Sequence, residues 1–456
     1  MQNPLAQDKS AASEGKEPAP AVYVSELTLR NVRCFGPEEQ TLRLADSAGR
    51  PASWTVILGE NGVGKTTLLQ CLVALDPARH YLTHVPRDEP QVVLPTNGGG
   101  WSIYRDVDAP NETEICGKLA IPEAQSQTPT AYSSLNISVP TSSVRGIATP
   151  PYLGPKPNFH CCAYGATRRT GSTTLSEGTQ SDPTASLFLD YVTLVDAEEW
   201  LLVEDYARTR GSEPLAELRL ERVKAILIDL LPDVSALRVQ PRRLTNTRSG
   251  VRFVIEVDTP YGWVSLSELS LGYRTMIAWT VDFASRLFEL YPDSPNPLAE
   301  PAVVLVDEVD LHLHPKWQRQ LRNHLTERFP RTQFVVTAHS PLVVQASENE
   351  NLVVLRREGN HVIIDNDVET VRGWRIDQVL TSDLFGLETA RPPEYDSVIS
   401  RRNDLLTRGG PLNTNEERDL ESLEARIESL PAGESAEDQR AMDVIRRAAA
   451  KLQQRG

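Results

Sequence analysis

The segment GENGVGKT, residues 59–66, constrains the fold of this chain more than any other stretch of its 456 residues. It matches the spacing G-x-x-x-x-G-K-[ST], in which glycines allow backbone N–H groups to curl around phosphate oxygens. An apolar run, residues 53–59, precedes it, and residues 64–75 repeat apolar side chains at helical spacing. The sequence therefore predicts a strand, a phosphate-binding loop and a helix whose N-terminus faces the phosphates. A glycine-rich turn that binds nothing is the weaker interpretation, because the full motif has the required flanking elements.

Individual residues of this loop have distinct expected roles. Lys65 is predicted to hold the β- and γ-phosphates of ATP, and the Thr66 hydroxyl is predicted to bind the Mg²⁺ that accompanies the nucleotide. Mg²⁺ with ATP is therefore the expected cofactor. The other candidate nucleotide-binding residues of the loop are Asn61, Gly62, Gly64 and Thr67.

A second segment, VVLVDEVDLHLHPKW at residues 303–317, places acids and histidines after an apolar run. A P-loop protein needs an acidic residue at the end of a neighbouring strand to hold Mg²⁺, and Asp307 fits that position. Glu308, the next residue, is predicted to orient and activate the attacking water. A zinc site formed by His312 and His314 is the alternative, but the sequence supplies no further clear zinc ligands.

The composition disfavours several classes of protein. The formal net charge of −15 argues against a chain that coats nucleic-acid phosphates over its whole surface, although a local basic patch could still bind them. No run of about 18 apolar residues occurs, and residues 1–22 lack a signal region. We therefore expect a disordered leader, no membrane partner and a cytoplasmic location. The five cysteines lack zinc-finger spacing and indicate reduced thiols.

Strand and helix patterns alternate along most of the chain, which predicts an α/β fold with a mostly parallel core sheet covered on both faces. We expect one ATPase domain over residues 23–365. A stretch rich in Pro, Gly, Ser and Thr, residues 86–183, predicts an inserted β-rich lobe with long loops. Helical periodicity over residues 184–235 predicts a helical lobe, and the charged segment 366–456 predicts a C-terminal helical extension.

Several elements can be located within this domain. Two runs, GVRFVIEV and GWVSLSEL, are typical of the strands of a hairpin. The segment LGYRTMIAWTVDFASRLFEL predicts one long helix, and PKWQRQLRNHLTERF predicts another helix between the buried strands AVVLV and QFVVTAH.

Four motifs follow one another along the chain: GENGVGKT, LSLGYRT at residues 269–275, VVLVDEVDLHLHP, and VVTAHSP at residues 335–341. Together they resemble the ABC-type ATPases of the SMC, RecF and overcoming-lysogenization group, and LRNVRCF is similar to the opening strand of that group. The resemblance covers residues 23–365. It implies that ATP is sandwiched between two subunits of a head-to-tail dimer.

The resemblance also implies roles for residues outside the phosphate loop. Ser270 and Gly272 of the signature-like motif would contact the γ-phosphate held by the opposite subunit. His339 would be the switch histidine that senses the γ-phosphate, whereas taken alone it fits a strand-end histidine bound by backbone. His312 and His314 fall in the loop that faces the dimer interface.

One departure from the family pattern concerns the strand end where a glutamine is expected. The segment CAYGATRRTG, residues 162–171, occupies that place and contains no glutamine. Arg168 or Arg169 could face phosphate there, because arginine suits bidentate phosphate recognition. A solvated basic loop is an equal alternative.

Further segments, AYGATRR, DAEEWL and GWRIDQVLTSDLFG, resemble stand-alone ATPases of bacterial antiphage systems, and the Septu-type ATPases in particular. This resemblance implies a homodimer or larger homo-oligomer, a separate HNH-type nuclease subunit and DNA as a further partner. The alternatives are a chain with its own Toprim-type nuclease, a RecF- or SMC-like repair ATPase, and a transporter subunit. The C-terminal region lacks a D-x-D pair between apolar strands, and residues 76–268 lack sustained heptads. A short-lobed RecF-like protein therefore stays open.

Overall fold

The structure is a computed structural model, and the chain divides into two compact units, Met1–Arg372 and Gly373–Gly456. The predicted leader lies outside the described residues except for its last two positions. The structure describes residues 21–76, 113–122, 132–139, 159–170, 182–243, 251–407 and 413–428, apart from 47, 348–349, 369–370, 372 and 388–389.

A six-stranded sheet forms the core of the first unit, in the order β15-β14-β3-β13-β12-β6. All neighbouring pairs are parallel except the edge pair β14 and β15. The central strands β12 and β13 are buried along their whole length, as expected where both faces of a sheet are covered, and the sheet confirms the predicted α/β fold with mostly parallel strands. The strands are β3 (Trp54–Gly59), β6 (Cys161–Tyr164), β12 (Ala302–Val306), β13 (Thr332–Thr337), β14 (Asn351–Glu358) and β15 (His361–Asp365).

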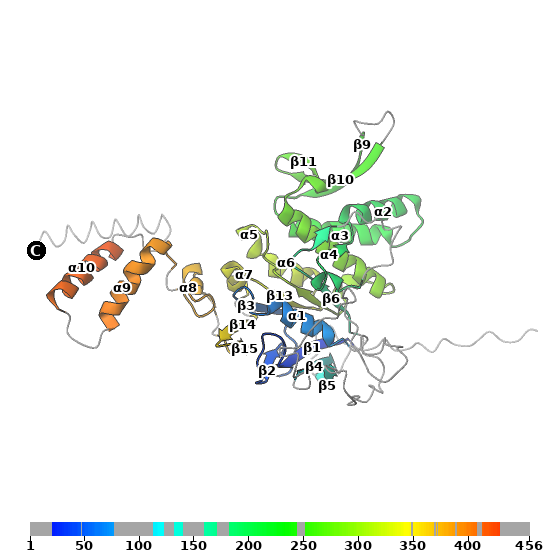
Figure 1. The fold of residues 1–456 in the computed structure, drawn as a ribbon. Coiled ribbons are helices and arrows are strands. Elements are labelled where there is room, and N and C mark those ends of the chain that lie inside the picture. The colour runs from blue at the N-terminus through cyan, green and yellow to red at the C-terminus, as the bar shows by residue number, and fades with distance from the viewer. Residues whose placement is uncertain are drawn as a thin grey trace, which may run out of the picture. The chain divides into compact units, whose positions relative to one another are not determined.

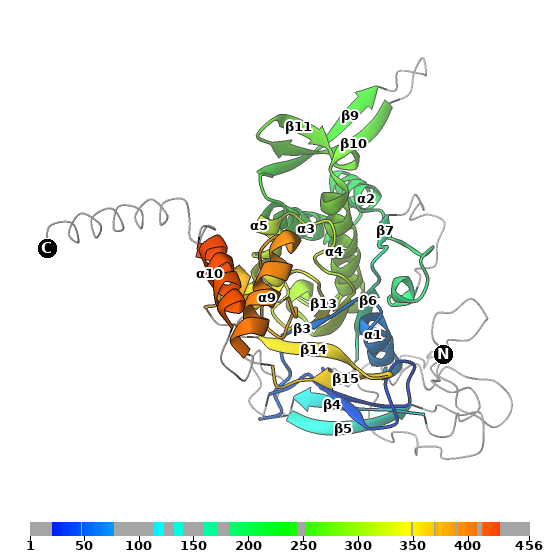
Figure 2. The ribbon, with the colours of Figure 1, turned by 60° about the vertical axis from the view of Figure 1, so that its left-hand side comes forward.

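A four-stranded antiparallel sheet lies on the other side of α1 (Lys65–Ala74), in the order β2-β1-β4-β5. Helix α1 is buried along almost its whole length, since it contacts β1 of this sheet as well as β3 and β13 of the core sheet (Figure 2). One hydrophobic cluster joins both sheets through the helix. The strands are β1 (Tyr23–Arg30), β2 (Gln40–Arg43), β4 (Glu114–Pro122) and β5 (Tyr132–Val139).

The strands of the predicted β-rich insert, residues 86–183, do not form a separate lobe in the described part of the chain. Strand β4 pairs with β1, β5 pairs with β4, and β6 is the edge strand of the core sheet beside β12. The composition of the segment carries no information on which distant strand each of its strands joins.

Helices and a small sheet make up the rest of the first unit. The predicted helical lobe contains α2 (Ala197–Arg210) and α3 (Ala216–Leu230). Strands β9 (Ala236–Arg243), β10 (Val251–Thr259) and β11 (Gly262–Ser265) form an antiparallel sheet that projects from these helices in both views (Figures 1 and 2). The predicted hairpin of β10 and β11 is confirmed. Shorter elements are β7 (Arg169–Thr170), η3 (Ala185–Leu187), β8 (Thr193–Leu194), η4 (Leu266–Glu268) and η5 (Pro297–Ala299).

The predicted long helix is α4 (Leu271–Leu290), which is buried over most of its length. The second predicted helix is instead two helices, α5 (Pro315–Gln318) and α6 (Leu321–Arg328). The backbone N–H of Gln320 donates to the carbonyl of Trp317, three residues back, and this tighter turn interrupts the helix. Helix α7 (Pro341–Ala346) follows β13.

The second unit is helical in its described residues. It contains α8 (Ile376–Leu380), η6 (Pro393–Tyr395), α9 (Asp396–Thr407) and α10 (Thr414–Glu428). An ion pair between Arg401 and Asp419, 3.1 Å apart, joins α9 to α10. Among the helices that the structure describes in either unit, none combines the length and apolar character that crossing a membrane requires.

Candidate nucleotide-binding site

The phosphate-binding loop connects β3 to α1, in the place that the sequence predicted. Gly64, the residue before α1, has φ +90°, and a Cβ atom there would overlap Sγ of Cys34. Both the left-handed backbone and the close contact therefore require glycine. Asn61 and Gly62 are exposed on the loop, and Thr67 is buried in the first turn of α1, where its hydroxyl lies 3.5 Å from Nη1 of Arg33.

Lys65 lies at the start of α1 with its ammonium group folded back onto the loop. Its Nζ atom donates to the carbonyl oxygens of Gly59 at 2.7 Å and Glu60 at 2.9 Å. Burial lowers the pKa of Lys65, and the nearby carboxylates of Asp307 and Glu308 oppose that shift. The lysine is thus placed to exchange two backbone carbonyls for the more strongly charged oxygens of a phosphate.

Asp307, at the end of β12, is held by two hydroxyl groups from different elements. The Thr66 hydroxyl donates to its Oδ2 atom and the Thr337 hydroxyl to its Oδ1 atom, each at 2.6 Å. Two residues that are 241 positions apart therefore meet beside the phosphate loop. The hydroxyl of Thr66 and the carboxylate of Asp307 are oxygen donors of the kind that Mg²⁺ takes, so this donor set fits the expected cofactor.

The backbone of Glu308 is held from two sides. Its N–H donates to the Thr337 hydroxyl at 2.7 Å, and its carbonyl accepts from Nη2 of Arg168 at 2.6 Å. Glu308 has φ +48°, in the left-handed region that non-glycine residues seldom adopt. The two hydrogen bonds stabilise this conformation at the residue for which the sequence predicts water activation.

His339 follows β13 and is tied to the same loop. Its backbone N–H donates to the carboxylate of Asp310, with 3.1 Å to Oδ2, and its side chain is exposed. Of the two histidines between these segments, His314 caps α5, since its Nδ1 atom accepts from the N–H of Lys316 at 3.3 Å. The bond between His339 and Asp310 connects the segments that follow β13 and β12.

The signature-like residues lie at the N-terminus of α4, on a different element from the phosphate loop. Ser270 is the exposed N-cap, and its side chain makes no capping hydrogen bond to the helix. Gly272 is buried against the carbonyl of His312, where a Cβ atom would overlap the oxygen. The contacts of Gly272 are therefore with the loop after Glu308, while the hydroxyl of Ser270 stays exposed at the surface.

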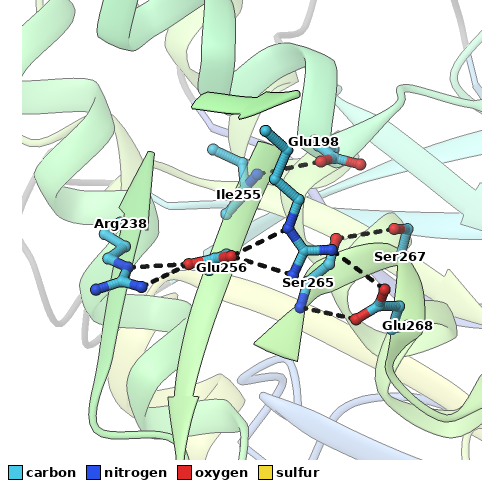
Figure 3. Close-up of polar contacts among 8 residues, drawn as sticks. Glu198, Arg238, Ile255, Glu256, Ser265, Ser267 and Glu268 are labelled. Carbon is cyan, nitrogen blue, oxygen red and sulfur yellow. Dashed lines mark hydrogen bonds and ion pairs between the residues drawn. The ribbon is translucent and has the colours of Figure 1, made fainter. Parts of the chain in front are cut away.

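Ion pairs fix the segment that leads into this helix. Ser265 and Glu268 form a reciprocal capping box around η4. Arg242 bonds to Glu268 at 3.3 Å and to Glu256 at 3.1 Å, so it joins the three-stranded sheet to η4. Figure 3 shows Glu256 bonded on its other side to Arg238, with an N–O distance of 2.7 Å.

We expect the Glu256→Gln variant to unfold about 2 °C below the parental chain at pH 7, because both arginines lose a charged partner. The side-chain hydrogen bond from Arg238 lowers the pKa of Glu256 from its ordinary value of 4.5. A lowered pKa stabilises the fold above the ordinary value and ceases to do so as the pH falls through the folded value. The difference in melting temperature between the two chains should therefore shrink below pH 4.5. A pH-independent difference would contradict this account.

The sequence assigned no role to two residues of the site, and it offered a third only as one of two candidate arginines. Thr337 bonds both Asp307 and Glu308, Asp310 accepts from His339, and Arg168 rather than its neighbour contacts Glu308. The exposed side chain of Arg169 makes it the less suitable of the two candidate arginines. Thr337 lies two positions before His339 in VVTAHSP, and that spacing on a strand was the available signal.

The Thr337→Val variant is expected to lower kcat for ATP hydrolysis about tenfold, as loss of an orienting partner does at comparable sites. It removes one of the two hydroxyl donors of the Asp307 carboxylate and leaves the Glu308 N–H without its hydroxyl partner, which costs about 1–3 kcal/mol in stability for the unpaired N–H. Thr332 offers a matched control on the same strand, because its buried hydroxyl has no hydrogen-bond partner in the described part of the chain. Thermal unfolding and phosphate release should both distinguish the variants; equal behaviour of Thr337→Val and Thr332→Val would contradict the assignment.

Parts of the chain are similar to known proteins. The family model "AAA domain, putative AbiEii toxin, Type IV TA system" matches residues 183–345, and the model "AAA domain" matches residues 26–75. "Retron Ec83 probable ATPase" of Escherichia coli is 37% identical over 191 residues, which are 41% of this chain and 32% of that protein. "Septu protein PtuA" of Bacillus mycoides (strain KBAB4) is 23% identical over 414 residues, 89% of this chain and 50% of that protein.

Among solved structures, an SMC head bound to the C-terminal winged-helix domain of ScpA matches with a TM-score of 0.38 and 12% identity, over 75% of this chain and 97% of that one. The two curated relatives are longer, and this chain spans half of their length or less.

The mostly parallel core sheet and the loop at residues 59–66 form a P-loop fold, as the sequence predicted, and the two matched segments are similar to AAA domains. Over longer stretches the chain is similar to a Septu protein and to a probable ATPase of a retron.

Proposed function

We propose that the chain binds ATP with Mg²⁺ and hydrolyses it, and that the nucleotide state acts as a switch for a partner protein. The observation that carries the proposal is the hydrogen-bonded group of Thr66, Asp307 and Thr337 beside Lys65. These hydrogen bonds already hold the start of α1, beside the phosphate loop, against the acidic end of β12. A glycine-rich turn with no ligand would not require this partnership.

Each residue has a definite part in this proposal. Lys65 binds the β- and γ-phosphates, and Thr66 and Asp307 hold Mg²⁺, which when bound neutralises charge on the phosphates. Glu308 accepts a proton from the attacking water and orients that water in line with the bond between the γ-phosphorus and the leaving ADP. His339, exposed beside Asp310, contacts the γ-phosphate and reports its loss.

The exposed N-terminus of α4 supports a dimer with ATP between the subunits. Ser270 offers a hydroxyl that its own helix does not use, and the helix N-terminus carries partial positive charge. In the proposed head-to-tail dimer, Ser270 and Gly272 approach the γ-phosphate bound by the partner subunit. His312 and His314 then lie near the interface, since the backbone of His312 packs on Gly272.

We place this switch in bacterial antiphage defence, in the cytoplasm, with a separate nuclease subunit of HNH type that acts on DNA. The support is the similarity to a Septu protein over 89% of the chain and to a retron ATPase over 41% of it. Co-purification from the native host, followed by DNA cleavage assays with ATP, ADP and a non-hydrolysable analogue, tests this part. A recombination mediator in place of a nuclease would overturn it in favour of a role in DNA repair.

Phosphate release by the purified full-length chain tests the ATPase itself. We expect turnover with ATP and MgCl₂ and its loss when EDTA removes the metal ion. A fluorescent ATP analogue measures binding separately. Absence of nucleotide binding at millimolar ATP would overturn the proposal, and binding without hydrolysis would restrict it to a nucleotide-binding switch.

A further inference from the structure

Arg168 is buried almost completely at the edge of the candidate site. The residue lies between β6 and β7, and it is only 2% exposed. Its backbone φ of +29° is unusual for a non-glycine residue. Within the described part of the chain, its Nε and Nη1 atoms have no hydrogen-bond partner. Buried arginines are rare unless they are paired, so this one is not explained by packing alone.

Three carboxylates provide the charge that keeps this guanidinium in place. Burial lowers the pKa of Arg168 to about 10, while Asp307, Glu308 and Asp310 oppose the shift. The group therefore stays positively charged at neutral pH. The same three carboxylates act on Lys65, so two cations from different elements share one acidic cluster.

The hydrogen bond from Nη2 of Arg168 is directed at the backbone of the proposed catalytic residue. This Nη2 atom donates to the carbonyl of Glu308 at 2.6 Å, and the N–H of Glu308 is bonded to Thr337 on the other side. A glutamate at φ +48° is strained and persists only where its surroundings impose that conformation. Arg168 and Thr337 each donate or accept a side-chain hydrogen bond that helps to hold it, beside the backbone bond from the N–H of Leu311 to the Glu308 carbonyl.

We propose that Arg168 is a positioning residue for ATP hydrolysis, because it holds the left-handed backbone of Glu308 that directs the carboxylate toward the attacking water. The inference rests on the proposed ATPase function. A buried guanidinium with two nitrogens that lack hydrogen-bond partners among the described residues lowers the stability of the fold. Such a loss of stability is expected at an active site where the residue serves the reaction.

The test compares Arg168→Ala and Arg168→Lys with Arg169→Ala. We expect kcat to fall about 10- to 100-fold in both Arg168 variants, as when a reacting group is misplaced by a small distance. KM for ATP and the affinity for a fluorescent ATP analogue should change less than about twofold, because Glu308 acts on water and not on nucleotide binding. Arg169 is exposed, so its replacement should leave the kinetics unchanged.

Chemical rescue separates positioning from general destabilisation. Guanidinium ion at low millimolar concentration should restore part of kcat to Arg168→Ala, since it can fill the vacated site, and should not restore Glu308→Gln. Arg168→Lys keeps the charge and tests the same geometry should the alanine variant fold poorly. Parental kcat in the Arg168 variants, or a loss of ATP affinity in place of kcat, would overturn the inference while leaving the ATPase function intact. A parental chain that hydrolyses no ATP would overturn both.

Discussion

Glu308→Gln is expected to lower kcat for ATP hydrolysis by about 10²- to 10⁴-fold, the usual loss when a general base is removed. Glutamine has nearly the same shape and keeps the backbone bonds to Thr337 and Arg168, so the local fold should be preserved. It cannot accept the proton of the attacking water. ATP should consequently stay bound, and the variant should accumulate as the ATP-dependent dimer.

Phosphate release, nucleotide retention and light scattering measure the three parts of this result on the same sample. Glu327→Gln is a suitable control, because Glu327 is an exposed residue of α6 outside the contacts of the candidate site. Parental turnover in Glu308→Gln would remove Glu308 from its catalytic role. Loss of ATP binding in that variant would instead indicate that Glu308 serves mainly to hold the nucleotide or its metal ion.

Local patterns predicted the elements around the phosphate loop well. The loop, its strand and its helix follow from glycine spacing and from apolar periodicity, both of which lie within a short window of sequence. Helix α4 begins and ends at the residues that its periodicity indicated. The contact of Thr66 with Asp307 could be expected because the motifs place both residues at the same edge of a parallel sheet, where only β13 separates β3 from β12.

Long-range pairing could not be predicted in the same way. Cys161–Tyr164 read as an apolar strand within a loop-rich stretch, but its place beside β12 depends on a parallel register between distant segments. That placement brings Arg168 to the backbone of Glu308, whereas the sequence offered Arg168 only as one of two arginines that could face phosphate. Thr337 was missed because a threonine inside an apolar strand is common, and its two bonds are visible only once β12 and β13 are adjacent.

A mixture of two inactive variants is expected to recover ATPase activity if ATP is bound between subunits. Lys65→Ala removes the phosphate contact of its own loop, and Ser270→Arg places a large side chain at the exposed start of α4. Each variant alone should lose hydrolysis, the first through failed ATP binding and the second with ATP binding to the single subunit intact. A heterodimer, however, keeps one site with an intact Lys65 from one chain and an intact Ser270 from the other.

Equal mixing should restore about a quarter of the parental rate, because half of the dimers are heterodimers and each retains one of two composite sites. Mixing Lys65→Ala with Glu308→Gln supplies the control, since both defects affect the loop side of a site and no heterodimer site is then complete. Recovery with the first pair alone requires that the exposed Ser270 acts on a nucleotide bound by another copy. An additive, inactive mixture would mean that each chain completes its own site, and the unused hydroxyl of Ser270 would then have no part in hydrolysis.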